Sequence, residues 1–519
     1  MSNREFDVTF PETAHQILFA PGLQRSAFEE KLLPDYIPRC RWFAGKAREP
    51  RRFSIRDVIP VSAAPHAARL MLVDVEYADK SSDTCLLPLQ FIAGQPAEAL
   101  AAQHPQAVVS QFAGGILCDA IHDPTFQSTL FTLIASGGTQ AGEKGSLVAQ
   151  RGPALREISD SPPSRALAVE QSNSSIVYGD AIFLKLYRRL ETGMNPDTEI
   201  LRFLSRRGFA HTPDFGGSIE YHGADGQACV IALATGLVPN HGDAWSFTLR
   251  ELARWFAAHL AGDVLEAAAI EEESLSRAAQ LGTRTGELHL ALAADTTDPE
   301  FSPQPLTTAD GQELAESTLA SARQIRDLIA SKLETLPDLA RNLAQRFLDG
   351  EATLQSRAAS LATPGGAAKI RTHGDYHLGQ VLETGGDFVI IDFEGEPLRA
   401  LATRRKRRSP FRDVAGMLRS FEYAAHAALD AQPFHQAALS APAAHWSAKT
   451  QRAFLDRWLA TTSGAVFRAA NPKQEDSLLE AFLLEKALYE VIYEINNRPA
   501  WLPIPLRGVV RLLEGNVAG

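Results

Sequence analysis

The sequence is poor in cysteine and has no long apolar run. Its four cysteines (Cys40, Cys85, Cys118 and Cys229) are far apart and form no C-x-x-C pair, which argues against a disulfide framework and against a zinc site. No run of about 18 apolar residues occurs, and the N-terminus lacks an apolar signal core. We therefore expect no membrane span, and a reducing, cytoplasmic setting.

Positive charge is also scarce. The 51 lysines and arginines are outnumbered by 62 acidic residues, giving a net charge of -11. This argues against an electrostatic nucleic-acid binder, although a local basic patch remains open. At 519 residues, 45% hydrophobic and 22% charged, the composition is ordinary but the chain is too long for one core. Two or three domains are expected, and no internal repeat is visible.

The first third of the chain mixes strand-like and helix-like segments. The motif RWFAGKAR at 41–48 is either an exposed turn with a buried Trp-Phe anchor or a basic loop facing substrate. The expected strands cover 54–60, 68–75, 84–92, 130–135 and 145–150, and a helix with a loop is expected at 96–106.

Two carboxylates carry the strongest chemical signal. Asp375 lies in the polar loop HGDYHLGQ, and Asp392 follows the apolar run FVII seventeen positions later. The Gly385-Gly386 pair between two strand-like runs predicts a hairpin that returns Asp392 to the loop of Asp375. One acid can then orient a hydroxyl while the other holds a divalent metal, as in a kinase catalytic loop and its metal-binding strand. Gln380 offers an amide oxygen to a second metal.

A strand-rich stretch carries the second signal. Lys185 lies between leucines in an expected strand at 181–187, and a lysine amid apolar neighbours must have its ammonium paired or directed to solvent. In a nucleotide-binding sheet the ammonium would contact phosphate oxygens. A polar segment before it could give backbone N–H groups and hydroxyls to the phosphates, or be an ordinary hairpin turn. This segment consists of Gln171, Ser172, Asn173, Ser174 and Ser175.

The next helix offers an acidic partner. The segment NPDTE at 195–199 opens an amphipathic helix, with Pro196 fitting its first turn. Glu199 can pair with Lys185 and aim it, as in kinases, or merely complement the helix dipole. An apolar strand at 229–234 then leads to a hinge, where backbone groups near Val238 would take an adenine.

From about residue 244 the pattern is mostly helical. Asp243 is a good N-cap for a helix at 244–260, and 313–357 suit one or two long helices. His289 has apolar neighbours, which favours a hydrogen-bonded core histidine over a ligand. The basic run 404–408 is either a solvated face or, where kinases place the activation segment, a surface that steers an anionic nucleotide.

The C-terminal helix, expected at 477–495, has two distinct faces. Leucine, valine and isoleucine form an apolar stripe, while Lys486, Tyr489, Glu490 and Tyr493 share another face through helical spacing. Aromatic rings with charged neighbours suit a sugar, although an ordinary surface face has the same pattern. Arg498 and Trp501 follow the helix and would close the site.

Together these segments resemble the maltokinase family, especially the form joined to trehalose synthase. They occur in order along nearly the whole chain, so the match is highly specific. The segments are RWFAGKAR (41–48), EQSNSS (170–175), NPDTE (195–199), LVPNHGD (237–243), TGELH (285–289), HGDYHLGQVL (373–382), IIDFEGEP (390–397), RDVAGMLRSF (412–421) and EKALYEVIYEINNRP (485–499).

The resemblance implies an α+β, bilobal protein-kinase-like fold related to aminoglycoside phosphotransferases. The expected parts are an N-terminal cap at 1–110, an intermediate N-lobe subdomain with the nucleotide-binding sheet at 111–238, and a mostly helical C-lobe with the catalytic loop and sugar site at 239–519. Because the chain begins with Met and lacks a synthase portion, it is expected to be free-standing, with trehalose synthase as a candidate partner.

The implied activity is phosphorylation of maltose by ATP with Mg²⁺, giving maltose 1-phosphate for α-glucan and glycogen synthesis. Asp375 would be the catalytic base, and Gln380 and Asp392 would bind Mg²⁺. The ATP contacts would be Gln171, Ser172, Asn173, Ser174, Ser175, Lys185, Glu199 and Val238. The candidate sugar contacts are His373, Asp375, Glu394, Lys486, Tyr489, Glu490, Tyr493, Arg498 and Trp501.

Three other functions stay open. A related kinase could act on another sugar, such as glucosamine. A metal-dependent hydrolase would use the alternating His373, Asp375 and His377, but would leave Lys185 idle. A non-catalytic pseudokinase is disfavoured because all the chemical groups are present.

Overall fold

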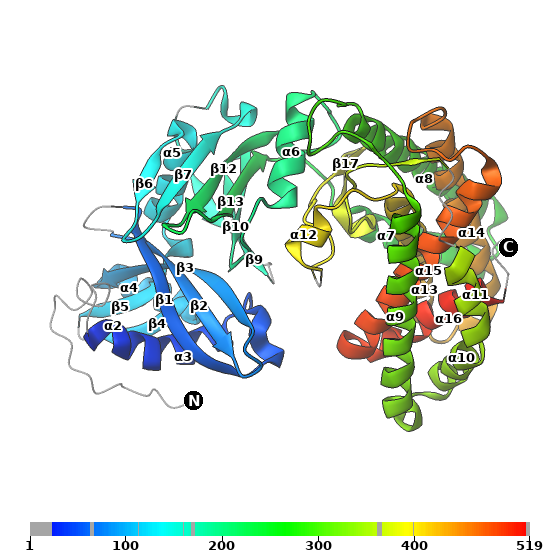
Figure 1. The fold of residues 1–519 in the computed structure, drawn as a ribbon, viewed down its shortest axis with the longest axis horizontal. Coiled ribbons are helices and arrows are strands. Elements are labelled where there is room, and N and C mark those ends of the chain that lie inside the picture. The colour runs from blue at the N-terminus through cyan, green and yellow to red at the C-terminus, as the bar shows by residue number, and fades with distance from the viewer. Residues whose placement is uncertain are drawn as a thin grey trace. The chain divides into compact units, whose positions relative to one another are not determined.

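The computed structural model describes residues 23–62, 67–112, 114–158, 160–167, 172–360, 366–397 and 399–514. The chain divides into two compact units, one formed by 1–206 with 213–238 and the other by 207–212 with 239–519. The first is rich in strands and the second is mostly helical (Figure 1). The division falls between Val238 and Pro239, where the helical C-lobe is expected to begin; the finer division of the first unit stays a prediction.

An antiparallel sheet with short helices against it begins the first unit. Its buried strand residues, such as Val73 and Leu87, pack against Phe28 and Leu33 from the short helices. The strands expected at 54–60, 68–75 and 84–92 form β1 (Pro50–Pro60), β2 (Arg69–Tyr77) and β3 (Ser82–Ala93). The sheet order is β1, β2, β3, β5 (Gly115–Asp119) and β4 (Val108–Phe112), with β11 (Arg189–Leu190) also on β3; β4 and β5 were not expected. The helices are α2 (Leu23–Ala27), a π-helical turn (Phe28–Leu32), α3 (Leu33–Tyr36) and α4 (Gln95–Gln103).

A second antiparallel sheet carries the expected nucleotide strands. Its order is β6 (Thr139–Ala141), β7 (Ser146–Arg151), β12 (Phe215–His222), β13 (Ala228–Gly236), β10 (Ile182–Tyr187), β9 (Asn173–Tyr178) and β8 (Ser164–Ala166). Two helices accompany it, α5 (Pro124–Ser136) and α6 (Pro196–Arg206). The central position of β10 places Lys185 between β9 and β13.

One expected strand of this region is wrong. Residues 130–135 lie in α5, whose N-cap Asp123 accepts hydrogen bonds from the backbone of Thr125 and Phe126. Leu130, Phe131 and Ile134 are buried at helical spacing. A short apolar run suits a strand and a buried helix equally, and the N-cap Asp123, seven residues before the run, decides for the helix.

The second unit packs two groups of helices. One group contains α7 (Ala244–Ala261), α8 (Val264–Ala293), α13 (Phe411–Asp430) and α14 (Gln436–Thr461); the other contains α9 (Thr308–Lys332), α10 (Asp338–Asp349), α11 (Glu351–Ser360), α15 (Pro472–Asn497) and α16 (Pro503–Leu513). Short elements connect them: β14 (Gln304–Pro305) with β15 (Ala368–Lys369), β16 (Val381–Glu383) with β17 (Phe388–Ile390), and α12 (Leu401–Arg404).

Local signals explain several helix ends in this unit. Asp243 caps α7 as predicted, since its side chain accepts from the Ser246 backbone at 2.6 Å. The stretch 313–357 forms parts of three helices instead of one or two, because it is interrupted before α10 at Pro337 and before α11 at Gly350. Along the described chain, no helix combines the length and apolarity needed to cross a membrane.

Candidate functional site

The predicted hairpin forms and returns the chain to the polar loop. β16 and β17 pair with Val381 opposite Ile390, and both turn glycines, Gly385 and Gly386, have positive φ. Ile391 then bonds to the loop through both of its backbone groups: its N–H donates to the Gln380 carbonyl at 3.0 Å, and its carbonyl accepts from His373 Nε2 at 2.9 Å. Asp392 is therefore held beside the loop that contains Asp375.

Asp392 and Glu394 form a compact pair of carboxylates. Carboxylate oxygens from the two residues lie within 4.8 Å of each other. Asp392 has a φ of 65°, a left-handed conformation that aspartate tolerates better than most residues and that turns the chain after β17. Carboxylate and amide oxygens are the donors that Mg²⁺ prefers, so the half-buried Asp392, Glu394 and Gln380 fit such an ion. Glu394, expected to contact sugar, is thereby also a candidate metal ligand.

The polar loop that contains Asp375 is held by the buried Asp413, which the sequence analysis did not single out as a site residue. Asp413 Oδ2 and Oδ1 accept hydrogen bonds from the backbone N–H groups of His373 and Gly374 at 2.8 and 2.9 Å. His289 Nε2 donates to Asp413 at 3.0 Å, while its Nδ1 accepts from Trp458 Nε1 at 2.9 Å. Burial opposes ionisation of Asp413, but these hydrogen bonds hold its pKa below the usual value.

His289 is thus the hydrogen-bonded core histidine that the sequence indicated. It is fully buried, and both ring nitrogens have partners within the helical unit. The Trp458 indole can only donate, so Nδ1 is the acceptor and the proton sits on Nε2, facing the carboxylate. His289 therefore fixes Asp413 and, through it, the loop of His373 and Gly374.

His373 does not fit the sugar-contact role expected of it. The side chain is 1% exposed, its Nε2 donates to the Ile391 carbonyl, and its Nδ1 faces the backbone N–H of Asp375 at 3.4 Å. Both nitrogens are thus directed at backbone groups, which makes His373 a positioning residue. The same contacts leave no lone pair for a metal, so the His373, Asp375, His377 set is a poor ligand set for a hydrolase.

Asp375 is held by a lysine from the C-terminal helix. Lys486 Nζ lies 3.1 Å from Asp375 Oδ1 and 3.0 Å from Glu396 Oε1, so one ammonium bridges two acids. Arg399 and Arg412 also bind Glu396. Burial opposes both charges, yet Lys486 and the arginines keep the pKa of Glu396 far below the usual value, and Glu396 and Asp375 raise the pKa of Lys486.

The polar face of α15 lies partly in ion pairs. Glu490 Oε2 accepts from Arg419 Nε and Nη2 at 2.9 and 2.8 Å, and Arg498 binds Glu494 through two hydrogen bonds of 3.0 and 2.6 Å. Burial raises the pKa of Glu490 despite the arginine. Arg419 was not predicted, although a charged residue amid the apolar positions of α13 is a signal for a buried ion pair.

Aromatic rings cluster on and after the same helix. Arg498 lies 5.4 Å from the ring of Tyr493 and 4.8 Å from that of Trp501, and Trp501 stacks on Tyr423 with centroids 6.2 Å apart. The Lys486 ammonium is 5.0 Å from the Tyr489 ring. The structure therefore gathers the predicted sugar-face residues, but it gives Lys486 and Glu490 protein partners of their own.

In the first unit, Lys185 lies next to an acid of the following helix. Its Nζ is 3.6 Å from Asp197 Oδ2, and its side chain is 15% exposed. Asn195 Oδ1 accepts from the Asp197 backbone at 2.8 Å and fixes this first turn of α6. Glu199, the predicted partner, is buried in the same helix. Asp197 is therefore a candidate, besides Glu199, for the acid that orients the Lys185 side chain.

The polar segment before Lys185 is partly strand. β9 begins at Asn173, Ser174 Oγ accepts from Arg188 Nε at 2.8 Å, and Ser175 is fully buried. A buried hydroxyl cannot meet a phosphate without a rearrangement, so the ATP role of Ser175 is disfavoured, while Ser172 is exposed. Gln171 lies outside the described residues, and Val238 is half-buried at the end of the unit.

Comparison with known proteins identifies a cap domain near the N-terminus and related kinases. Residues 36–123 match the maltokinase N-terminal cap domain. A glucosamine kinase from Streptacidiphilus jiangxiensis is 27% identical over 354 residues, covering 67% of this chain and 73% of that protein. A glucosamine kinase from Mycolicibacterium smegmatis is 26% identical over 351 residues, covering 67% and 79% respectively.

Solved structures show the same fold along most of the chain. A glucosamine kinase in complex with glucosamine, ADP and inorganic phosphate aligns with a TM-score of 0.62 and 22% identity, covering 90% of this chain and 94% of that one. Crystal form B of glucosamine kinase gives a TM-score of 0.64 at 21% identity, covering 92% and 97%. The predicted kinase-like α+β fold with an N-terminal cap is confirmed.

Proposed function

Since the cap-domain match and the two glucosamine kinase relatives support membership of this chain in the maltokinase family, we propose that it is an ATP-dependent sugar kinase acting on the anomeric hydroxyl of maltose. The observation that carries the proposal is the geometry around Asp375. This carboxylate is 20% exposed, held by Lys486 at 3.1 Å, and tied through Ile391 to the segment of Asp392.

The chemistry asked of these residues is positioning and proton transfer. Asp375 orients the sugar hydroxyl and accepts its proton while the hydroxyl oxygen attacks the γ-phosphorus. The new P–O bond forms as the bond to the β-phosphate oxygen breaks, and ADP leaves. Mg²⁺, when held by Asp392, Glu394 and Gln380, would neutralise the triphosphate charge. Lys185 would contact phosphate oxygens, aimed by Asp197 or Glu199.

The ion pairs that the acidic residues of α15 form with arginines support maltose as the substrate over a positively charged sugar. An ammonium sugar needs an available carboxylate, but Glu490 and Glu494 are bound by Arg419 and Arg498. Aromatic rings nearby offer faces for the C–H groups of a neutral disaccharide. Glucosamine is the second candidate, because both relatives are glucosamine kinases.

Phosphorus NMR of the products tests this function. After incubation with Mg·ATP and maltose, we expect ADP and a phosphate monoester signal coupled to an anomeric proton; glucosamine in a parallel sample should give less product. Asp375→Asn should abolish transfer while calorimetry still detects Mg·ATP binding. Equal turnover by this variant would remove Asp375 from its role, and glucosamine as the better substrate would reverse the order of the two candidates.

Two further features of the cellular role are part of the proposal. We place the protein in a reducing, cytoplasmic setting, which is supported by four free cysteines that are all buried. Trehalose synthase, which would supply the maltose, is the proposed partner. Sedimentation of the two purified proteins together checks this association, and separate boundaries at all concentrations would contradict it.

A further inference from the structure

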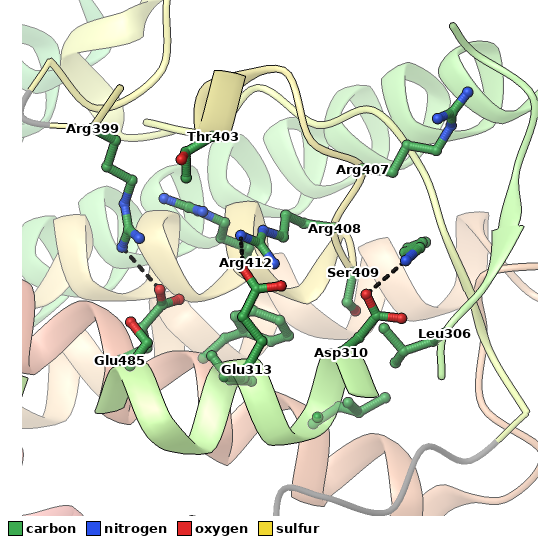
Figure 2. A pocket seen from close by; sticks show the side chains of 16 residues that line it. Leu306, Asp310, Glu313, Arg399, Thr403, Arg407, Arg408, Ser409, Arg412 and Glu485 are labelled. Atoms are coloured by element: carbon green, nitrogen blue, oxygen red, sulfur yellow. Dashed lines mark hydrogen bonds and ion pairs between the residues drawn. The ribbon is translucent and has the colours of Figure 1, made fainter. Parts of the chain in front are cut away.

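A cavity of about 200 Å³, lined by charged and apolar side chains, lies in the second unit beside the ion-pair network of Asp375. Its walls come from α9, the chain between Arg399 and Arg412, and α15, with Lys369 from β15 (Figure 2). Two of the lining residues, Arg407 and Arg408, belong to the basic run 404–408, and Ser409 follows it directly. The polar residues that line the cavity are Asp310, Glu313, Ser317, Lys369, Arg399, Thr403, Arg407, Arg408, Ser409, Arg412 and Glu485.

The lining carries an excess of positive charge. Five cationic side chains face three carboxylates, so the formal excess is two positive charges. Each lining carboxylate has one lining cation: Lys369 binds Asp310 at 2.6 Å, Arg408 binds Glu313 at 3.1 Å, and Arg399 binds Glu485 at 2.9 Å. Figure 2 shows the pair of Arg399 and Glu485. The remaining lining cations are Arg407 and Arg412.

These two arginines are used in different ways. Arg412 binds Glu396, which lies behind the lining, at 2.6 Å. Arg407 donates from Nη2 to the Pro299 carbonyl, and its Nε is buried without a hydrogen-bond partner among the described residues. A buried guanidinium donor without an acceptor is costly. Figure 2 shows the Arg407 side chain directed away from Glu313 and Arg412, so Arg407 adds positive charge near the cavity and is not counted as a direct contact to a ligand.

We propose that this cavity binds a phosphate group, either free or carried by a single sugar. A phosphate monoester has a charge of roughly −1.5 to −2 near neutral pH, opposite in sign to the excess of the lining, of which Glu396 offsets one charge through Arg412. Arginine forks suit phosphate oxygens, and Thr403 and Ser409 add hydroxyls. The volume is below the roughly 300–1,000 Å³ of drug-sized ligand sites, which favours a small anion over a nucleotide.

The cavity is linked to the proposed active site through shared residues. Arg399 and Arg412 line the cavity and also bind Glu396, and Glu396 shares Lys486 with Asp375. A phosphate that draws these arginines toward itself leaves Glu396 short of positive charge. Lys486 then shifts toward Glu396 and away from Asp375, so occupancy lowers turnover. This consequence rests on the proposed function and amounts to inhibition by phosphorylated products.

Calorimetric titration of the full chain with inorganic phosphate, without nucleotide, tests the binding. We expect one saturable site per chain that Arg408→Gln weakens about tenfold, as the loss of a charge-assisted contact predicts. Lys406→Gln is the matched control, because Lys406 pairs with the same Glu313 at 2.9 Å but does not line the cavity. Arg407→Gln is the second variant, should Arg408→Gln fail to fold, and should weaken binding by less than tenfold, because it removes positive charge near the cavity without removing a direct contact.

A variant of the first unit separates this cavity from the nucleotide site. Lys185→Gln should leave phosphate binding unchanged; if it abolishes binding while Arg408→Gln retains it, the phosphate sits on the nucleotide residues and the proposal is wrong. Absence of saturable binding also overturns it. Glucose 1-phosphate competing with inorganic phosphate identifies a sugar phosphate as an occupant, and failure to compete restricts the site to free phosphate.

Kinetics then test the coupling separately. Phosphate should lower kcat of the wild type without competing with ATP or sugar, and should have little effect on Arg408→Gln. If the chain has no kinase activity, the calorimetric result still stands, so failure of the proposed function and failure of the phosphate site give different observations.

Discussion

Replacing Lys486 by methionine removes the one ammonium shared by Asp375 and Glu396. Methionine fills a similar apolar volume, so the main change is the loss of charge. Losing one partner of a buried ion pair costs roughly 3–5 kcal/mol. Glu396 keeps Arg399 and Arg412, and Asp375 is 20% exposed and can be hydrated. We therefore expect a loss at the lower end, about 3 kcal/mol in the free energy of unfolding.

The same substitution should affect catalysis more than stability alone explains. Without the 3.1 Å contact, Asp375 is free to rotate, and misplacement of a catalytic group by about 1 Å can cost on the order of 100-fold in rate. We expect a fall of that size in kcat/KM, measured by ADP release, with Mg·ATP affinity nearly unchanged. Urea unfolding followed by tryptophan fluorescence measures the stability term.

Lys449→Met is the control for this experiment. Lys449 also lies on a helix of the second unit and pairs with one acid, Glu271, but its side chain is 44% exposed. Exposed pairs contribute about 0–1 kcal/mol, so the control should keep its stability and turnover. If Lys486→Met behaves like Lys449→Met in both assays, the bridge does not position Asp375 and the reasoning fails.

The remaining predictions concern the support of the catalytic loop and the response to pH. Asp413→Asn should lower the free energy of unfolding by roughly 1–3 kcal/mol, because the amide has one acceptor oxygen where the carboxylate has two, so a buried N–H of the loop or of His289 loses its acceptor. Urea curves check this, and unchanged stability would contradict it. Gly416→Ala should cost about 1–3 kcal/mol in the same assay, because its new Cβ would lie 2.5 Å from the Tyr376 carbonyl oxygen, and unchanged stability would show that α13 can shift freely. Burial and then nearby Arg507 lower the pKa of His426 to about 4. His426 is therefore protonated in the unfolded chain at a higher pH than in the folded protein, so the free energy of unfolding falls as the pH drops from about 7 toward 4. Between about pH 8 and pH 5 the wild type should lose roughly 2 kcal/mol more of this free energy than His426→Asn. Equal losses would refute the lowered pKa of His426.

Local sequence signals predicted the elements that carry the site. The Gly385-Gly386 turn between two apolar runs produced the hairpin that returns Asp392, and Asp243 caps its helix as expected. The apolar stripe of Leu484, Leu488, Val491 and Ile495 on the C-terminal helix is buried. In each case the deciding interactions lie within a few residues along the chain, where spacing and residue type contain the information.

The missed features depend on partners that are far apart in sequence. Lys486 was assigned to a sugar, yet it pairs with Asp375 and Glu396, 111 and 90 positions away. Arg419 and Glu490, 71 positions apart, likewise pair with each other. A charged residue on a helix has the same local pattern whether it meets a ligand or a buried acid, so only the packing of α13 against α15 distinguishes the two.

The use of both Ile391 backbone groups has a consequence for how this position can vary. Ile391 helps to place Asp392 through its backbone N–H and its backbone carbonyl oxygen. Every residue type except proline has both of these groups. Valine or leucine at residue 391 should be tolerated, whereas proline would delete the donor to Gln380 and release one side of the segment that carries Asp392. Mutational scanning should thus show that position 391 accepts most residue types and rejects proline, whereas the neighbouring Asp392 tolerates almost no substitution.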